Sequence, residues 1–343
     1  MKAPNHILVT GGAGYIGAHT VVELLIAGCK VTVVDTLERS EYRIIEGIES
    51  ITGTKVDFHK MDCLDFTTLD KLFSANSFST VIHFAAYKSV NESVAKPLAY
   101  YRNNVGSLMT LLEVMKKHQT TDLIFSSSCT VYGQPDQIPV DESAPFKKAE
   151  SPYGSTKQLC ERILEDVATE GFRIISLRYF NPIGAHPSAM IGELPIGIPN
   201  NLVPYVTQTA AGIREKLTVF GNDYNTPDGS CIRDFIHVGD VAMAHVKAMD
   251  YLQQQKEEKF FEAFNLGTGV GVSVLELVNK FIDATGVKVP YLIGPRRSGD
   301  VEKVYADPLK INRALGWTTK YDLGQSLLHA WQWEKKIRNL QYH

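Results

Sequence analysis

A tyrosine and a lysine stand four residues apart, at Tyr153 and Lys157, directly after Ser151 and Pro152. Serine is a preferred helix N-cap and proline fits the first helical position, so the sequence predicts a helix that begins here. Residues four apart lie on one helix face, which brings the phenol and the ammonium group together. A positive charge beside a phenol favours the phenolate, so this pair could remove a proton at neutral pH although a free tyrosine titrates near ~10.

Three glycines, Gly11, Gly14 and Gly17, directly follow an apolar run at residues 6–10. The run predicts a strand and the amphipathic stretch at 15–27 predicts a helix, so the glycines lie in the turn between them. Glycine permits both the tight turn and the close backbone approach that a pyrophosphate needs at a helix N-terminus. The spacing differs from the common G-x-G-x-x-G, but the strand–turn–helix context predicts a dinucleotide site.

Asp35 closes the next predicted strand, Val31–Asp35. A carboxylate at this point accepts a hydrogen bond from the ribose 2′-hydroxyl of adenosine and repels a 2′-phosphate, so the sequence predicts NAD rather than NADP. Arg39 is the nearby feature that could instead accommodate the phosphate. A cationic nicotinamide ring near Tyr153 would add to the charge that favours its phenolate.

A serine run that includes Ser128 follows the predicted strand Asp122–Ser126. Ligands of a doubly wound sheet lie beyond the carboxyl ends of its strands, so these hydroxyl groups are positioned to reach a substrate.

The elements that carry these residues alternate between short apolar runs and helical patterns, which predicts βαβ units. The predicted strands cover residues 6–10, 31–35, 56–59, 80–85, 122–126 and 173–178, and the longer predicted helices cover 97–118 and 152–170. The fold class is therefore α/β: a Rossmann-type doubly wound parallel sheet with a smaller, mostly C-terminal α/β lobe. We expect a dinucleotide-binding domain at 1–180 with a returning segment at about 235–285, and a substrate lobe at 181–234 and 286–343.

Composition excludes several classes of protein. The chain carries 38 acidic and 35 basic residues, for a net charge of −3, so no global positive field would draw it to nucleic acid or to an anionic membrane. Its five cysteines form no C-x-x-C pair, and no H-E-x-x-H or Cys/His cluster suggests a metal site. No secretory leader or membrane-length apolar run is present in the sequence, so we expect a cytoplasmic protein without a metal.

The glycine loop, the serine run ending in Val131-Tyr132-Gly133 and the Tyr153/Lys157 pair occur in an order that resembles the extended short-chain dehydrogenase/reductase family. Five later motifs resemble its UDP-glucose 4-epimerase branch: Arg178-Tyr179-Phe180-Asn181, Asn200-Asn201-Leu202, Phe220-Gly221-Asn222-Asp223-Tyr224, Asp228-Gly229-Ser230-Cys231-Ile232-Arg233-Asp234 and Arg296-Arg297-Ser298-Gly299-Asp300. The similarity extends over essentially the whole chain.

The resemblance implies bound NAD and a UDP-sugar substrate, with Ser128 and Tyr153 at the sugar 4-oxygen and Lys157 at the nicotinamide ribose. The residues implied for the NAD site are Gly11, Gly14, Tyr15, Ile16, Gly17, Asp35, Asp62, Cys63, Phe84, Ala85, Lys88, Asn103, Tyr153, Lys157 and Phe180. Those implied for the UDP-sugar are Ser128, Tyr153, Asn181, Asn201, Leu202, Phe220, Arg233, Arg297, Asp300 and Val304. It also implies a homodimer formed through the helices near 97–118 and 152–170.

The sequence departs from the family pattern at two places. Residues 36–40 replace an Asn-rich turn that often contacts adenosine, and Val304 stands where some members carry a bulky tyrosine that closes the sugar pocket. The resemblance implies interconversion of UDP-galactose and UDP-glucose, and the smaller valine leaves N-acetylated UDP-hexoses, or both substrate types, as an alternative. UDP-glucuronate variants also remain open.

Two other functions share parts of this pattern. A sugar-nucleotide 4,6-dehydratase usually carries carboxylates where this chain has Cys129 and Thr130, and a non-catalytic NAD-binding protein would not need Ser128, Tyr153 and Lys157 together. The sequence therefore favours an epimerase over both.

Overall fold

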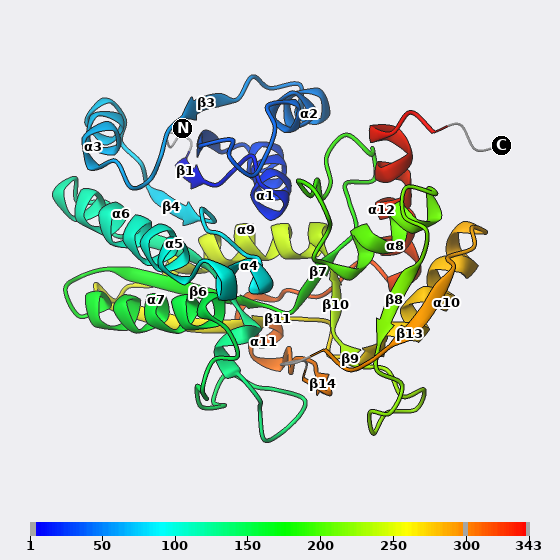
Figure 1. Ribbon diagram of the computed structural model, residues 1–343. Helices are drawn as coiled ribbons and strands as arrows, with labels where there is room; N and C mark the ends of the chain where they lie inside the picture. Colours follow the sequence, from blue (N-terminus) through cyan, green and yellow to red (C-terminus); the bar gives the residue numbers. More distant parts are fainter. Residues whose placement is uncertain (1–4, 298–300, 341–343) are drawn as a thin grey trace.

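Seven parallel strands form the central sheet of the computed structural model, which describes residues 5–297 and 301–340 (Figure 1). Their order across the sheet is β11-β6-β5-β4-β1-β2-β3. The strands are β1 (His6–Thr10), β2 (Lys30–Asp35), β3 (Asp57–Lys60), β4 (Thr80–His83), β5 (Asp122–Ser128), β6 (Arg173–Tyr179) and β11 (Phe260–Leu266). The strand order reverses between β1 and β4, so the predicted Rossmann-type sheet with its switch point is confirmed.

Helices cover both faces of this sheet (Figure 1). Those on one face are α1 (Tyr15–Ile26), α2 (Arg43–Thr52) and α9 (Val238–Gln254). Those on the other face are α3 (Phe66–Ala75), α6 (Gly106–Lys117) and α7 (Pro152–Ala168). Consecutive strand residues such as Val33 and Val34 therefore enter two separate hydrophobic cores. Burial on both faces explains why the strands were continuous apolar runs in the sequence.

The helix predicted over residues 97–118 is interrupted in the structure. Its parts are α5 (Pro97–Tyr100), a π-helical turn η1 (Tyr101–Val105) and then α6. Within the turn, the buried Asn104 side chain donates to the Tyr87 carbonyl and to the Thr156 hydroxyl, both at 3.0 Å, and accepts from the Tyr87 N–H at 2.8 Å. This amide ties α7 to the loop after β4, a tertiary contact that helical periodicity does not encode.

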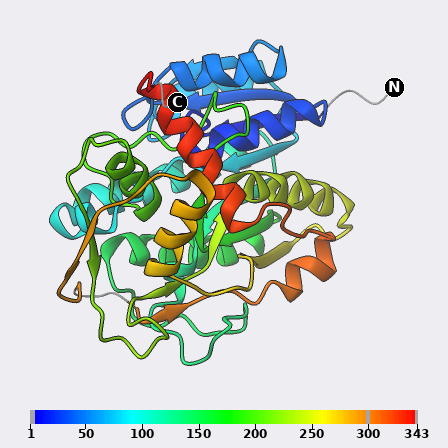
Figure 2. The same ribbon diagram turned by 90° about the vertical axis from the view of Figure 1, so that its right-hand side faces the viewer.

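The smaller lobe is built from short elements (Figure 2). Its helices are α8 (Leu202–Ala210), α10 (Val274–Thr285) and α12 (Leu323–Ile337). Its strand pairings join β7 (Asn181–Ile183) with β10 (Phe235–His237), β8 (Leu217–Phe220) with β13 (Tyr291–Gly294), and β9 (Ile232–Arg233) with both β12 (Val272–Ser273) and β14 (Lys303–Val304). Val206, Phe281 and Trp331 are buried together in the core of this lobe.

Two helices pack differently from the sequence-based domain boundaries. Helix α10, which belongs to the segment expected to return to the dinucleotide-binding domain, lies beside α12 (Figure 2). The ring centres of its Phe281 and of Trp331 in α12 are 6.0 Å apart. Helix α11 (Leu309–Leu315), assigned to the smaller lobe, instead contributes Ile311 to the core beneath α1 and α9. Short amphipathic helices show which face is buried but not which core receives it.

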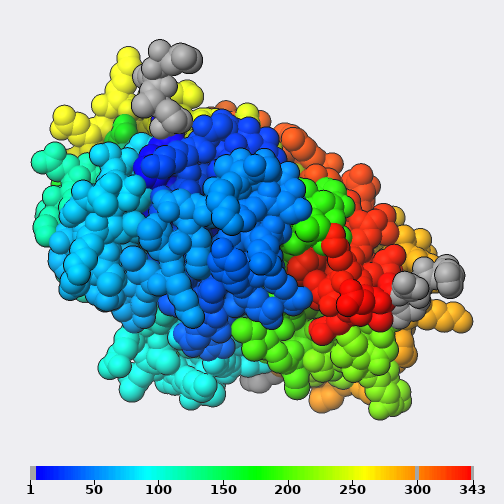
Figure 3. All heavy atoms as spheres, turned by 90° about the horizontal axis from the view of Figure 1, so that it is seen from above, coloured from blue at the N-terminus to red at the C-terminus, as the bar shows by residue number. Residues whose placement is uncertain are grey.

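Helix α12 also joins the two lobes, and its surface adjoins that of the N-terminal elements (Figure 3). Trp333 is buried in the core that contains α1, and its indole N–H donates to the Glu193 carbonyl at 2.8 Å. A side-chain carbon on Gly192 would lie 2.5 Å from this indole ring, so the approach requires glycine. The interface is therefore packed like a domain interior.

Among residues 5–297 and 301–340, none of the helices has the length and apolar character needed to cross a membrane. The same residues include no cluster of three or more His, Cys, Asp or Glu side chains arranged to hold a metal ion. All five cysteines are free thiols.

Candidate active site

The glycine loop after β1 is pressed against the chain that follows β4. Gly11 has a φ of +71°, and a Cβ atom there would lie 2.7 Å from the Ala85 nitrogen. A Cβ on Gly17 would lie 2.3 Å from the Gly11 carbonyl oxygen. Gly14 is the N-cap of α1 and offers no side chain to the first amides of that helix. The loop thus leaves a helix N-terminus without a side-chain cap, the arrangement that binds a pyrophosphate.

Asp35, at the end of β2, holds the neighbouring backbone in place. Its carboxylate accepts hydrogen bonds from the N–H groups of Ala13 (3.1 Å) and Leu37 (2.9 Å) and from the Ser40 hydroxyl (3.1 Å). Burial raises the pKa of Asp35, and these three bonds act in the opposite direction. Only one of them reaches Oδ2, so this oxygen can still accept from a ribose hydroxyl.

The other residues predicted for the cofactor also follow the carboxyl ends of strands. Asp62 and Cys63 follow β3, Phe84, Ala85 and Lys88 follow β4, Asn103 lies in η1, and Phe180 follows β6. Tyr15 and Ile16 open α1. The residues that follow strands or open α1 therefore lie along one edge of the sheet, where a doubly wound fold binds its ligand, whereas Asn103 follows no strand.

Ser128 and Tyr153 meet at this edge. Ser128 ends β5, and Tyr153 lies in the first turn of α7, whose N-cap Ser151 accepts from the Gly154 N–H at 3.2 Å as the sequence predicted. Burial raises the pKa of Tyr153, and its hydrogen bond with Ser128 works against that rise. The protein groups by themselves therefore keep the phenol protonated at neutral pH.

Lys157 lies one turn further along α7 and is only 3% exposed. Its ammonium group donates to the Ser126 carbonyl and lies 4.7 Å from the centre of the Phe125 ring. Burial lowers the pKa of Lys157 to about 8. In the described part of the chain, no hydrogen bond joins this ammonium group to the Tyr153 hydroxyl. The four-residue spacing thus places Lys157 one turn from Tyr153 on the same helix, without the direct contact between the two groups that the spacing suggested.

A buried acidic residue that sequence reasoning missed, Glu161, lies one further turn along the same helix face. It is 0% exposed and pairs with Arg178 of β6, with Nη2–Oε2 at 2.6 Å. It also accepts from the hydroxyl groups of Ser127 and Ser176. The signal in the sequence was its position four residues after Lys157, because residues four apart share a helix face. Glu161 therefore fixes the strand end that carries Ser128 against the helix that carries Tyr153.

The residues predicted for the substrate lie in the smaller lobe and where it joins the sheet. They are Asn181 at the start of β7, Asn201 as the N-cap of α8, Leu202 as its first residue, Phe220 at the end of β8, Arg233 in β9 and Val304 in β14. Arg233 pairs with Val304 across adjacent strands, and the Arg297 guanidinium lies 5.6 Å from the centre of the Phe220 ring. Asp300 lies outside the described residues.

Glu193, which sequence reasoning also missed, connects the residues predicted for the cofactor with those predicted for the substrate. Its carboxylate accepts from the Lys88 ammonium at 2.7 Å and from the Asn201 amide at 2.6 Å. Lys88 also lies 5.7 Å from the centre of the Tyr15 ring. One carboxylate therefore joins residues predicted for the cofactor to a residue predicted for the substrate.

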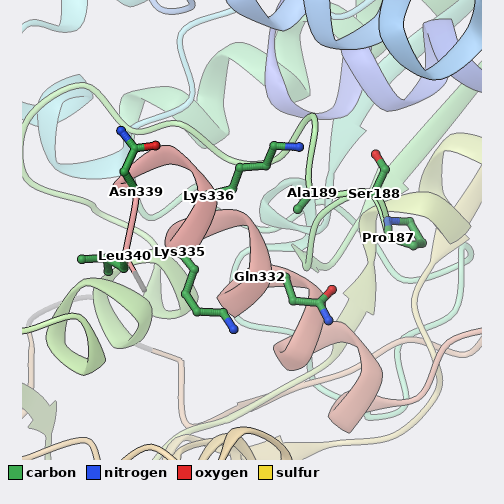
Figure 4. Close-up of a pocket in the computed structure, with 8 residues that line it drawn as sticks. All are labelled: Pro187, Ser188, Ala189, Gln332, Lys335, Lys336, Asn339 and Leu340. Carbon is green, nitrogen blue, oxygen red and sulfur yellow. The ribbon is translucent and has the colours of Figure 1, made fainter. Parts of the chain in front are cut away.

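A separate surface hollow lies between the loop at residues 187–189 and α12 (Figure 4). Its lining residues are Pro187, Ser188, Ala189, Gln332, Lys335, Lys336, Asn339 and Leu340. It includes none of the residues predicted for cofactor or substrate.

The chain resembles known sugar-nucleotide enzymes along nearly its whole length. The family model described as GDP-mannose 4,6 dehydratase matches residues 8–328. A UDP-glucose 4-epimerase of Dictyostelium discoideum is 48% identical over 332 residues, 96% of each chain. One of Bacillus subtilis (strain 168) is 48% identical over 335 residues, 97% of this chain and 98% of that protein.

A solved structure shows the same fold. UDP-glucose 4-epimerase from Bifidobacterium longum, in complex with NAD+ and UDP, superimposes with a TM-score of 0.93 at 44% identity. The match covers 98% of this chain and 99% of that one.

Proposed function

The chain belongs to the UDP-glucose 4-epimerase family, and we propose that it interconverts UDP-galactose and UDP-glucose by inversion at C4 of the sugar. NAD, when bound, supplies the redox chemistry by accepting hydride from C4 and returning it to the other face of the 4-keto sugar. The observation that carries the proposal is the meeting of the glycine loop, the Ser128–Tyr153 pair and the buried Lys157 at one sheet edge.

The residues of this edge fit NAD. Gly11 and Gly17 leave no room for side chains where the pyrophosphate would approach α1, and the first turn of α1 has no side-chain cap. Asp35 would hold the adenosine ribose through its remaining acceptor, and its charge disfavours a 2′-phosphate. The Arg39 guanidinium group donates to Glu92 at 2.9 Å, which also favours NAD over a cofactor with a 2′-phosphate.

Tyr153 is the proposed acid–base group. It takes the proton of the sugar 4-hydroxyl, and Ser128 hydrogen-bonds to the same oxygen and to the phenol. Because burial raises the pKa of Tyr153, additional positive charge must lower it again. We assign that role to Lys157 together with the charge of the oxidised cofactor, and we assign Lys157 also to the nicotinamide ribose.

The proposed substrate contacts are strong on the nucleotide side and weak on the sugar side. Arg233 and Arg297 match the pyrophosphate in charge, and the exposed Phe220 ring offers a surface for the uracil. Around the sugar, Val131, Phe180 and Val304 form an apolar cluster that supplies few polar contacts. A sugar held in this way can turn and present its second face, which inversion requires.

The direct test is turnover of UDP-galactose labelled with deuterium at C4, without added NAD. We expect UDP-glucose that retains the label at C4, since hydride returns to the carbon it left. Loss of the label to water would contradict the proposed reaction. Tyr153→Phe is the control, because it keeps the ring but removes the hydroxyl that accepts the proton.

The residues at the place of a 4,6-dehydratase's additional acid–base group argue against that function. Cys129 and Thr130 occupy the short helix η2 (Cys129–Tyr132) that follows Ser128. Burial raises the pKa of Cys129 to about 12, so this thiol supplies no acid–base group at neutral pH. Elimination of water from the sugar requires such a group.

A second substrate class is supported by Val304. Its side chain is 8% exposed and packs in the cluster with Val131 and Phe180, where it takes less room than the tyrosine of some family members. We therefore propose that UDP-N-acetylhexosamines are also accepted. Turnover of UDP-N-acetylglucosamine would be compared with that of UDP-galactose, and complete inactivity on the former would refute this part.

We propose a homodimer formed through α5, α6 and α7. Leu98, Met109 and Leu159 are 83%, 49% and 44% exposed on these helices, and such exposed apolar side chains mark association surfaces. Light scattering should give twice the chain mass for the wild type and the monomer mass for Leu98→Glu with Leu159→Glu. We also propose a cytoplasmic, reducing location, which the five free thiols support.

A further inference from the structure

Residues 36–40, which depart from the family pattern, face a second loop that lies on the other side of the glycine loop. Glu38 and Arg39 lie between β2 and α2, while Tyr87 follows β4 and Glu92 lies in α4 (Val90–Ala95). Strands β2 and β4 pair with opposite edges of β1. The loops that follow them therefore flank the glycine loop from both sides.

Side chains from these two loops meet. The Tyr87 hydroxyl donates to Glu38 at 2.7 Å, and the Arg39 guanidinium donates to Glu92 at 2.9 Å. The same guanidinium lies 4.7 Å from the centre of the Tyr87 ring. We call these four residues the clasp.

One side of the clasp is anchored in the core. The second carboxylate oxygen of Glu92 accepts from the Tyr100 hydroxyl at 3.1 Å, and Tyr100 is 1% exposed. Tyr100 also accepts from the Ser89 N–H at 3.0 Å, which fixes the start of α4. On the other side, Ser40 and Leu37 bind Asp35 and so connect the loop of Arg39 to the proposed ribose site. Hydrogen bonds to Tyr100 therefore hold one loop of the clasp in place, and hydrogen bonds to Asp35 hold the other.

We propose that the clasp closes over the adenosine half of the bound dinucleotide and slows its release. This rests on the proposed NAD site, because the pyrophosphate at α1 and the ribose at Asp35 would lie between the two loops. The cofactor must leave past both loops, so the Glu38–Tyr87 and Arg39–Glu92 contacts have to break first. An enzyme that reoxidises its own cofactor in each cycle benefits from slow release of that cofactor. If the reduced cofactor left during the cycle, the 4-keto sugar could not be reduced again.

Each contact is partly exposed and should act modestly by itself. Arg39 and Glu92 have side-chain exposures of 49% and 22%. For such a pair, and for one hydroxyl–carboxylate bond, we expect removal to speed release about threefold each. Because the two contacts join the same loops, the double variant should release NAD about tenfold faster.

The experiment uses the NAD-loaded protein and measures the rate at which bound NAD exchanges with excess labelled NAD. The variants are Tyr87→Phe, Glu92→Gln and their combination; Gln keeps an acceptor for Tyr100 and Phe keeps the ring. The control is Glu170→Gln, which breaks another exposed ion pair, with Lys116, far along the chain from the clasp. Thermal unfolding of each nucleotide-free variant checks that the loops still fold.

We expect faster exchange in the clasp variants and wild-type exchange in the control. Added salt should accelerate exchange in the wild type but not in Glu92→Gln, because it screens the Arg39–Glu92 pair. Wild-type exchange rates in the double variant would overturn the clasp while leaving the NAD site intact. Failure of the wild type to bind NAD at all would overturn the proposed function itself, and the clasp with it.

Discussion

Replacing Glu161 by glutamine tests how far the active site depends on a buried charge. Glu161 and Arg178 are 0% and 4% exposed, and both carboxylate oxygens of Glu161 lie 3.1 Å from the Arg178 Nε. Gln keeps one acceptor oxygen for Ser127 and Ser176 but turns an N–H₂ group toward the guanidinium. The change therefore leaves a buried arginine without a counter-charge and sets two donors against each other.

The magnitude follows from the burial of the pair. Removing one partner of a buried ion pair costs about 3–5 kcal/mol, because the remaining charge stays desolvated. At roughly 2 °C per kcal/mol for a chain of this size, the melting temperature should fall by about 6–10 °C. The Arg178 guanidinium also donates to the Tyr132 hydroxyl at 2.9 Å and lies 4.9 Å from the Phe146 ring centre. Moving this group into solvent would break both contacts, so it stays buried in the variant.

The assay is thermal unfolding at fixed pH and fixed NAD concentration, since bound ligand shifts the apparent stability. Glu170→Gln, in the exposed pair with Lys116, should leave the melting temperature unchanged. Glu161→Leu combined with Arg178→Met removes both charges and should recover most of the loss. A melting temperature for Glu161→Gln within about 1 °C of the wild type would refute the reasoning.

Three further outcomes follow from the site. Tyr153→Phe should lower turnover by about 10²–10⁴-fold, the usual contribution of an acid–base group, while NAD measured in the purified protein stays bound; near-normal turnover would remove Tyr153 from the reaction. Val304→Tyr should reduce turnover of UDP-N-acetylglucosamine at least about tenfold more than that of UDP-galactose, because the larger ring takes the room that we assign to the N-acetyl group, and equal losses would contradict the pocket assignment. Acidification from pH 7.5 to 5.5 should cost about 5 kcal/mol of unfolding free energy, measured by denaturant titration, because four buried histidines have pKa values lowered by burial and the unfolded chain binds more protons below about 6.5. These are His19, His83 and His237, with pKa values of about 3, and His245, with a pKa of about 4. A flat profile over that range would contradict those shifts.

The strands and helix α7 were predictable because their signals are local. Apolar runs such as residues 6–10 and 122–126 became β1 and β5, since strands buried on both faces tolerate little else. Ser151 and Pro152 gave the start of α7 because capping chemistry needs only neighbouring residues. Positions at the ends of these elements followed directly, which is why the sequence placed Ser128 after a strand and Tyr153 in the first turn of a helix.

The features that the sequence did not predict depend on contacts between segments that are far apart in the chain. The π-helical turn at Tyr101–Val105 accommodates Asn104, whose partners lie 17 and 52 residues away. The clasp likewise joins Arg39 to Glu92 over 53 residues. In the sequence, Glu161 looks like an ordinary polar position of a helix. Only the packing of β6 against α7 places Arg178 beside it. No local pattern specifies which distant residue will complete such a contact.

Helix α7 shows why stability and chemistry are difficult to separate in this protein. Tyr153, Lys157 and Glu161 follow one another at four-residue steps, so one helix face carries a half-buried phenol, a buried cation and a buried anion. Burial raises the pKa of Tyr153 and lowers that of Lys157 to about 8, so the protein opposes ionisation of the phenol and disfavours the charged form of the lysine. Glu161 adds a negative charge that favours the ammonium form of Lys157, while Arg178 balances the carboxylate. We therefore expect ionisation of the phenol to need the positive charge of Lys157 and of an oxidised cofactor together, which would confine proton removal to the NAD-loaded protein.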